Sequence, residues 1–265
     1  MSQETFTDQL VKACCADFYQ TDLVMSFLGE NLHPGGLDLT RDLGKALELE
    51  EWDRVLDIAS GLGASAVHLS QTFRCQVVGV DYGQDQIAHA RKRAFDNKVF
   101  ERVTFRQGDA ESLKDHDGSY DAVVCECAVS TFPNKEAAAT EMHRVLRPGG
   151  KLGITDVALN GPLAPELSGV AASAACIGMA LSTQGYKDLF ENAGFTDLKA
   201  TDHSHTLHNL VKGLQTKVMM ARLASASGLF QVEGIDLKQA QDLLLLAEAE
   251  IKEGRLGYVM LTAQA

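Results

Sequence analysis

The sequence has little of what marks disordered linkers, membrane spans or thiol-based metal sites. Its 265 residues include only 5 prolines and 1 tryptophan, and no apolar run approaches the roughly 18 residues of a transmembrane helix. The six cysteines form no Cys-x-x-Cys pair, so neither a zinc knuckle nor a thioredoxin motif is indicated. The opening stretch, MSQETFTDQL, lacks the basic and apolar regions of a signal peptide. We therefore expect a cytoplasmic protein that does not enter a membrane.

Positive charge is also scarce. The chain has 24 Lys and Arg against 36 Asp and Glu, which gives a formal net charge of −12. Nucleic acids require a basic face, so this balance argues against a nucleic-acid partner and leaves a small-molecule substrate open. A hydrophobic fraction of 45% is ordinary for a globular protein, and the length suits one α/β domain with additions.

Short apolar runs alternate with helical patterns through the middle of the chain. Strands are expected at 54–58 (RVLDI), 76–80 (QVVGV), 102–106 (RVTFR), 121–126 (DAVVCE) and 151–156 (KLGITD). Helical periodicity lies between them at 62–72, 84–97 and 134–146. Strands separated by helices of this length form βαβ crossovers. The sequence therefore predicts an α/β, Rossmann-like fold on a mostly parallel sheet with helices on both faces.

Further elements flank this region. A helical pattern at 4–28 is followed by HPGG (33–36), whose glycines suit either a closing lid or a plain linker, and then by a short helix at 41–49. After the fifth strand come a loop-like stretch (157–181), a helix (183–193), a strand (195–201), two helices (206–226 and 236–252) and a last strand (255–263). The expected sheet thus has seven strands. We divide the chain into an N-terminal helical lid (1–50), a core (51–202), a helical cap (203–254) and the final strand of the core sheet (255–265).

The first strand runs into a glycine-containing turn, VLDIASGLGASAVHLS (55–70). Gly61-x-Gly63-x-x-Ala66 lets backbone amides and a helix N-terminus approach a polar ligand, and Asp81 ends the next strand, where a carboxylate accepts ribose hydroxyls. These features serve a nicotinamide dinucleotide and S-adenosylmethionine (SAM) alike, and a glycine turn without a ligand is also compatible with them.

Three features favour SAM over a dinucleotide. Asp57 lies inside the end of the first strand, where it suits an ammonium group better than a phosphate. QGDAE (107–111) follows the third strand, where an acid can accept the exocyclic amine of adenine. No Tyr-x-x-x-Lys pair typical of a dehydrogenase is present. We therefore expect SAM as the cofactor.

The motifs VLDIASGLG, VVGVD, GDAE and RVLRPGG, in this order, resemble those of class I SAM-dependent methyltransferases. The resemblance implies a methyltransferase whose sheet ends in an antiparallel strand, here LGYVMLTA. Ala59-Ser60 replaces the Gly-Cys of many members, and because both residues are small we expect the loop to form. The cofactor-binding residues that it implies are Asp57, Ala59, Ser60, Gly61, Gly63, Asp81, Tyr82, Gln86, Asp109, Ala110, Glu111 and Glu126.

Two cysteines lie where such a fold binds its methyl acceptor. Cys125 and Cys127 are two residues apart at the end of the fourth strand, so their side chains should share a face, with Glu126 facing the other way or the pocket mouth. The alternative is that both are ordinary buried strand residues.

A narrower resemblance concerns the acceptor. CAVSTFPNKEAAATEMHRVLRPGGKLGITDV, followed by ACIGMALSTQGYKDLFENAGF, is similar to the arsenite methyltransferases. It implies that Cys127 and Cys176 bind a trivalent arsenical, with Cys125 as a third thiol or in reduction, and with a thiol reductant as a further partner. Those enzymes usually carry a third cysteine before the first strand, and Cys14 and Cys15 do not clearly match it.

Other functions stay open at this point. Two thiols suit a monomethylated arsenical, but the acceptor is alternatively a small thiol, a selenium compound, a quinone-type carbon or an amine. A SAM-binding protein without turnover is the rival from another class. His203, His205 and His208 have no accompanying carboxylate cluster, so we expect no metal there.

Overall fold

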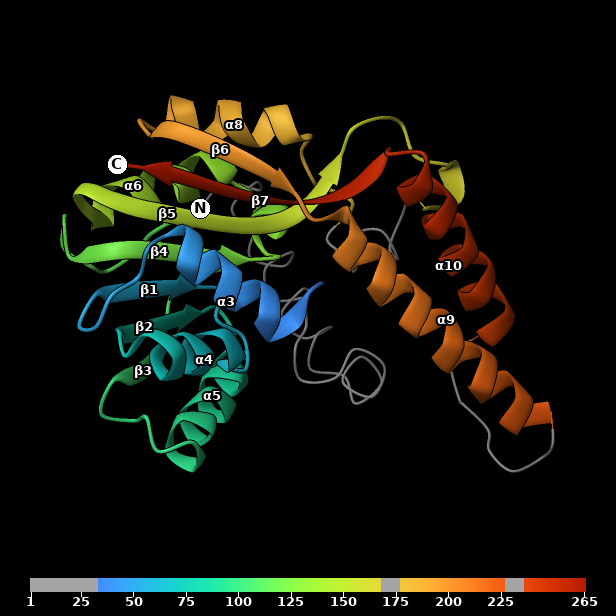
Figure 1. Ribbon diagram of the computed structural model, residues 1–265, viewed down its shortest axis with the longest axis horizontal. Coiled ribbons are helices and arrows are strands. Elements are labelled where there is room, and N and C mark those ends of the chain that lie inside the picture. Colours follow the sequence, from blue (N-terminus) through green and yellow to red (C-terminus); the bar gives the residue numbers. More distant parts are fainter. Residues whose placement is uncertain (1–32, 168–176, 227–235) are drawn as a thin grey trace, which may run out of the picture.

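The computed structural model describes residues 33–167, 177–226 and 236–265. Their centre is a seven-stranded sheet with strand order β3-β2-β1-β4-β5-β7-β6 (Figure 1). The strands are β1 (Arg54–Ile58), β2 (Gln76–Asp81), β3 (Val103–Gln107), β4 (Tyr120–Glu126), β5 (Leu146–Leu159), β6 (Thr196–Asp202) and β7 (Leu256–Gln264). β7 runs antiparallel to its neighbours β5 and β6, and the other adjacent pairs are parallel. The expected mostly parallel, Rossmann-like sheet with an antiparallel last strand is confirmed.

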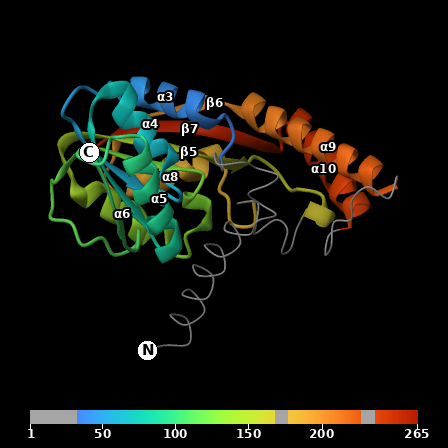
Figure 2. The same cartoon turned by 90° about the horizontal axis from the view of Figure 1, so that it is seen from below.

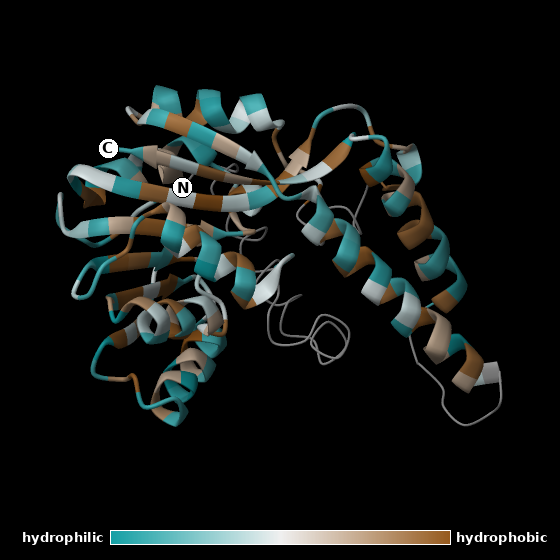
Figure 3. Cartoon of the chain, viewed as in Figure 1, coloured by the Kyte–Doolittle hydropathy of each residue, from teal (hydrophilic) through white to brown (hydrophobic). Residues whose placement is uncertain are grey.

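Side chains that alternate along the strands pack into two hydrophobic cores, one on each face of the sheet. α3 (Gly36–Ala46), α4 (Ala64–Phe73) and α5 (Gln84–Asp96) bury apolar residues in one of them, here called the α3-side core. α6 (Lys135–Val145) and α8 (Thr183–Asn192) do so in the other, the α6-side core. Figure 2 shows α3 and α4 on the opposite side of the sheet from α6. In Figure 3 hydrophobic colours concentrate on the central strands, whereas α8 is largely hydrophilic.

Between β6 and β7 the chain leaves the sheet as a pair of helices, α9 (Ser204–Ala226) and α10 (Leu237–Lys252). The two helices lie side by side and project beyond the sheet (Figures 1 and 2). Among the described residues, the bases of the two helices join the main body, where Leu207, Val211 and Ile251 enter the α3-side core. Within the three described ranges, no helix has both the length and the apolar character needed to cross a bilayer.

The two boundaries that differ most from the expectations are the starts of β5 and α3. β5 begins at Leu146 instead of residue 151, because the Arg-Pro-Gly-Gly stretch forms an irregular part of the strand where its pairing with β4 shifts register. α3 begins at Gly36 instead of residue 41, since Gly35 adopts a left-handed φ of 83° and caps the helix. The predicted helix at 4–28 lies outside the described residues.

α3, which belongs to the predicted lid, packs directly on the sheet. Leu43 and Leu47 are almost fully buried, and they pack so closely on β5 that a Cβ at Gly153 would lie 2.8 Å from each. This part of the predicted lid is therefore a packed layer of the core.

Candidate cofactor and acceptor site

The glycine loop joins β1 to α4 through three left-handed residues. Ala59, Gly61 and Gly63 have φ values of 57°, 49° and 78°. An added Cβ at Gly63 would lie 2.6 Å from the Phe105 ring, so this glycine is required by packing as well as by its φ. Among the residues that the structure describes, nothing lies within 4 Å of the same position at Gly61, which leaves space there beside the loop backbone. The loop forms with Ala59 in place, as expected.

Asp81 at the end of β2 holds this loop in place. Its Oδ2 accepts the Gly61 amide at 2.8 Å, and its Oδ1 accepts the Gly83 amide at 2.9 Å. Burial raises the pKa of Asp81, while the amides of Gly83, Gly61 and Tyr82 act in the opposite direction. Gln86 is buried on α5 and packs against Gly83. The arrangement brings the glycine loop and the predicted ribose site together.

Asp57 and Glu126 lie on one face of the sheet at the ends of adjacent strands. Asp57 pairs with Val124, two residues before Glu126. Asp57 is 2% exposed, and burial, followed by the charge of Glu126, raises the pKa of its carboxyl. Neither Asp57 Oδ2 nor Glu126 Oε1 has a hydrogen-bond partner in the part of the chain that the structure describes. Ser60 Oγ, in the neighbouring loop, is likewise buried and without a partner among those residues.

The loop after β3 carries the predicted adenine-binding residues Asp109, Ala110 and Glu111. Asp109 Oδ1 accepts the Glu111 amide at 3.0 Å, which closes a tight turn. Glu111 Oε1 accepts the amide of Asn134, the residue that caps α6. Glu111 therefore ties this loop to α6.

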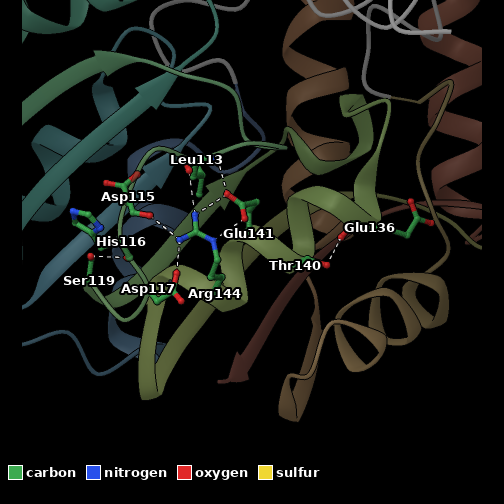
Figure 4. A network of polar contacts seen from close by, with 9 residues as sticks. All are labelled: Leu113, Asp115, His116, Asp117, Ser119, Glu136, Thr140, Glu141 and Arg144. Carbon is green, nitrogen blue, oxygen red and sulfur yellow. Dashed lines mark hydrogen bonds and ion pairs between the residues drawn. The ribbon is translucent and has the colours of Figure 1, made fainter. Parts of the chain in front are cut away.

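Arg144 on α6 fixes the rest of that loop, a role that the sequence reasoning missed (Figure 4). Its guanidinium donates to the carbonyls of Leu113 and Asp115 at 3.1 and 2.7 Å and to Asp117 Oδ1 at 2.7 Å. Glu141 pairs with the same guanidinium and accepts the Leu113 amide at 2.7 Å. The RVLRPGG motif thus supports the adenine loop through its first arginine.

The two cysteines of β4 do not share a face, so that prediction is wrong. Cys125 has 0% exposure in the α6-side core, whereas Cys127 packs against the α3-side core. The reason is that β4 ends at Glu126 and Cys127 turns into a left-handed φ of 56°. Burial raises the pKa of the Cys125 thiol well above its usual range. The structure therefore gives the predicted acceptor role of Cys125 no support.

Cys127 is half-buried at the carboxyl end of β4, next to β5 and β7. Its amide donates to the Thr155 carbonyl at 2.6 Å. Tyr258 on β7 donates from its hydroxyl to Thr155 Oγ1 at 3.1 Å. Burial first, and then the proximity of Cys127, raise the pKa of Tyr258, so the hydroxyl beside the thiol stays neutral. Cys176, the second predicted thiol, lies outside the described residues, as do Cys14 and Cys15.

The histidines near the start of α9 do not form one cluster. The rings of His203 and His205 lie 5.8 Å apart, whereas His208 lies 3.5 Å from Glu248 on α10. Across residues 33–167, 177–226 and 236–265, no group of three His, Cys, Asp or Glu side chains is placed to hold a metal ion.

The site fits SAM on its own geometry. Two buried carboxylate oxygens without partners suit an ammonium group, which carries three N–H donors. The open space at Gly61 allows a ligand to reach the loop backbone, and the surrounding carboxylates are complementary to a sulfonium. The residues that would hold the methionine end are Asp57, Ala59, Ser60, Gly61, Gly63 and Glu126. The residues predicted for the ribose are Asp81, Tyr82 and Gln86, and those predicted for the adenine are Asp109, Ala110 and Glu111.

A family model described as a methyltransferase domain matches residues 49–194, more than half of the chain. The chain belongs to this methyltransferase family. Together with the fit of its site, this makes the protein a SAM-dependent methyltransferase.

Two curated relatives name different substrates. An arsenite methyltransferase from Aquipseudomonas alcaligenes is 32% identical over 69% of this chain and 56% of its own length. The match thus spans little more than half of that relative. A 27-O-demethylrifamycin SV methyltransferase from Amycolatopsis mediterranei is 29% identical over 92% of this chain and 93% of its own.

Solved structures share the architecture. The crystal structure of the [4+2]-cyclase SpnF matches with a TM-score of 0.77 over 97% of this chain and 95% of that chain, at 23% identity. At this identity the likeness establishes the fold of the whole methyltransferase, including the α9–α10 pair, and leaves its acceptor open.

Proposed function

We propose that this methyltransferase transfers the methyl group of SAM to a trivalent arsenical held by the thiolates of Cys127 and Cys176. The observation that carries the proposal is the position of Cys127, a half-buried thiol one residue beyond Glu126 at the end of β4. The similarity to an arsenite methyltransferase supports it. The resemblance of the stretch ACIGMAL, which contains Cys176, to those enzymes supports it as well. Cys125 has no place in the proposal, because its thiol is fully buried in the opposite core.

The cofactor contacts follow from the geometry of the site. Asp57 and Glu126 would receive the ammonium group through their free oxygens, and Asp81 would receive the ribose hydroxyls. Asp109 would accept the adenine amine, on a loop that Arg144 holds. SAM, when bound, supplies an electrophilic methyl group on a sulfonium that leaves as a neutral thioether.

Thiolates suit the proposed acceptor because trivalent arsenic is soft. The arsenic lone pair forms the new bond to the methyl carbon, and the electron pair of the broken carbon–sulfur bond returns to sulfur. Arsenic is oxidised from the trivalent to the pentavalent state in this step, so the cycle also requires a thiol reductant. Holding the arsenic at attack distance would supply part of the roughly 7–11 kcal/mol available from orientation.

The domain division is part of the same proposal. We propose that the α9–α10 pair, within residues 203–254, caps the acceptor, and that residues 51–202 with the last strand, 255–265, form the SAM-binding core. Residues 1–50 would close the site as a lid from the N-terminal side, with α3 as its fixed base.

The test is transfer to arsenite and to methylarsenite, measured as release of S-adenosylhomocysteine and as methylated arsenic. We expect Cys127→Ser and Cys176→Ser each to abolish transfer while SAM binding persists. Cys75→Ala removes a buried thiol just before β2, at the amino ends of the parallel strands and so at the other end from Cys127. It serves as the control that keeps activity. Activity retained in both serine variants would exclude the arsenical.

A second candidate is methyl transfer to a hydroxyl of a larger natural product. The rifamycin relative favours it, because that match extends over 92% of this chain, whereas the arsenite match covers 69%. The same release assay with phenolic and macrocyclic acceptors tests it, and Cys127→Ser should then be tolerated. A protein that binds SAM but releases no product with any acceptor would be a binding protein without turnover.

A further inference from the structure

The buried face of α3 carries one polar side chain among apolar residues. Leu39, Thr40, Leu43 and Gly44 are buried along this face, and Thr40 has 0% exposure. A hydroxyl in such a place needs a hydrogen-bond partner. Thr40 Oγ1 donates to Glu126 Oε2 at 2.9 Å, between residues that are 86 apart in sequence. Thr40 therefore joins α3 to the end of β4.

His33 lies at the same carboxylate oxygen. Its Nε2 is 3.7 Å from Glu126 Oε2 and 3.4 Å from Thr40 Oγ1. The side chains of His33 and Glu126 are only 9% and 4% exposed, so bulk water does not screen this contact. One oxygen of Glu126 thus accepts a hydrogen bond from Thr40 and lies close to His33, both of which belong to the segment that leads into and forms α3.

The other oxygen of Glu126 is available. Oε1 is buried without a hydrogen-bond partner among the described residues, and the same holds for Oδ2 of Asp57 on the adjacent strand. Two neighbouring buried carboxyl groups repel each other when both are ionised, so such a pair favours either a proton or a bound cation. The ammonium group of SAM is a cation with three donors, enough for both.

We propose that Thr40 and His33 are positioning residues of the cofactor site, which hold one oxygen of Glu126 so that the other, with Asp57, receives the ammonium group. The proposal rests on the cofactor contacts assigned above to Asp57 and Glu126, and it does not depend on which acceptor is methylated. Thr40 and His33 act through Glu126 and do not themselves contact the cofactor. The start of α3 thereby becomes part of the cofactor-binding machinery.

Two ligands separate positioning from a structural role. S-adenosylhomocysteine carries the ammonium group, and 5′-methylthioadenosine has the same nucleoside and sulfur without it. Thr40→Val keeps the shape of the side chain and removes the donor to Glu126. We expect it to weaken S-adenosylhomocysteine binding about tenfold, as loss of a hydrogen bond to a buried charge does, and to change 5′-methylthioadenosine binding less than about twofold. Calorimetry on the full chain measures both.

Controls make the result specific. Thr40→Ser retains the hydroxyl and should restore the wild-type dissociation constants. Thr140→Val makes the same change on α6 and should alter neither ligand, because within the described part of the chain this hydroxyl bonds only to the carbonyl of Glu136 in its own helix. Equal weakening of both ligands by Thr40→Val, or no weakening of either, would overturn the proposal. A wild-type protein that binds S-adenosylhomocysteine no more tightly than 5′-methylthioadenosine would overturn it as well.

A second variant covers the case in which Thr40→Val does not fold. His33→Leu removes the other group at Glu126 Oε2 without changing α3, and it should produce the same selective loss of S-adenosylhomocysteine affinity. A wild-type protein that prefers S-adenosylhomocysteine as expected but methylates no arsenical would count against the proposed acceptor alone, so the two failures are distinguishable.

Discussion

Both oxygens of the Asp156 carboxylate lie 2.8 Å from Ser130, one from its amide nitrogen and the other from its hydroxyl. Asp156 on β5 also accepts the Val157 amide at 2.7 Å and has no exposed surface. Burial raises its pKa to about 6, and the three donors counteract this only in part. These contacts attach the turn that follows Cys127 to β5, the strand next to the proposed acceptor position.

The first prediction concerns the pH dependence of stability. A carboxyl whose folded pKa lies above its unfolded value of 3.8 favours the folded state most below that value, and the benefit is lost as the pH rises through about 6. The free energy of unfolding, taken relative to Asp156→Asn, should therefore fall by about 1 kcal/mol between pH 5 and pH 7. Urea unfolding at several pH values measures it. Asp202→Asn is the control, because Ser204 lowers the pKa of Asp202 and moves its titration out of this window.

The second prediction is that SAM binding releases protons. The pKa of Asp57 is raised by burial, Glu126 and Asp81, and an ammonium group at its free oxygen would favour the ionised form. The affinity for SAM should fall as the pH drops through the pKa of Asp57 in the free protein. Calorimetry between pH 5 and 8, in buffers of different ionisation enthalpy, counts the released protons. Asp57→Asn should bind more weakly and lose the buffer dependence, and an unchanged dependence would exclude this role.

The third prediction tests the support of the adenine loop. Arg144→Met removes the donors to the carbonyls of Leu113 and Asp115 and leaves Glu141 without its partner. We expect a loss of about 2 kcal/mol in unfolding free energy, together with weaker binding of 5′-methylthioadenosine. Arg147→Met is the matched control from the same motif, since its ion pair with Asp121 is exposed and contributes little. Equal effects of the two variants would contradict the role of Arg144.

The fourth prediction concerns the strained residue of the glycine loop. Ala59 has a φ of 57°, a conformation that costs a residue with a Cβ about 1 kcal/mol relative to glycine. Ala59→Gly should therefore raise the unfolding free energy by up to about 1 kcal/mol, as measured by urea denaturation. Ala66→Gly, in the interior of α4, should lower it. A less stable Ala59→Gly protein would show that the methyl group has a packing role.

Much of the fold was predictable from local patterns. The run at 54–58 coincides with β1, and the run at 76–80 is one residue shorter than β2. Both were predictable because short apolar runs between turns are typical of buried parallel strands. The second half of β5 pairs with β7 as far as Leu159. This tertiary pairing extends the strand into residues 157–159, for which the sequence predicts a loop. Its start at Leu146 was hidden for a related reason, since Pro148 and Gly149 indicate a turn and are here accommodated by irregular pairing.

Some of the site residues were likewise predictable from the sequence, and others were not. Asp57 and Asp81 were predictable, because their positions at strand ends follow from the sequence alone. The relation between Cys125 and Cys127 was not, because it depends on where β4 stops and on one left-handed residue. Thr40 was also missed, since its partner Glu126 is reached only through the packing of α3 on the sheet. A threonine on an otherwise apolar helix face was the available signal.

The insertion of α9 and α10 has a consequence for assembly. β7 lies between β5 and β6 in the sheet, although both of these strands precede it in the sequence. α9 and α10 separate β6 from β7 along the chain, so β7 can pair with its two neighbours only after both helices have been synthesised. Until that happens β6 has no neighbour to bond with, and β5 presents a bare edge. Completion of the sheet therefore depends on contacts between segments far apart in sequence, which are slow to form because the chain between them must first be ordered.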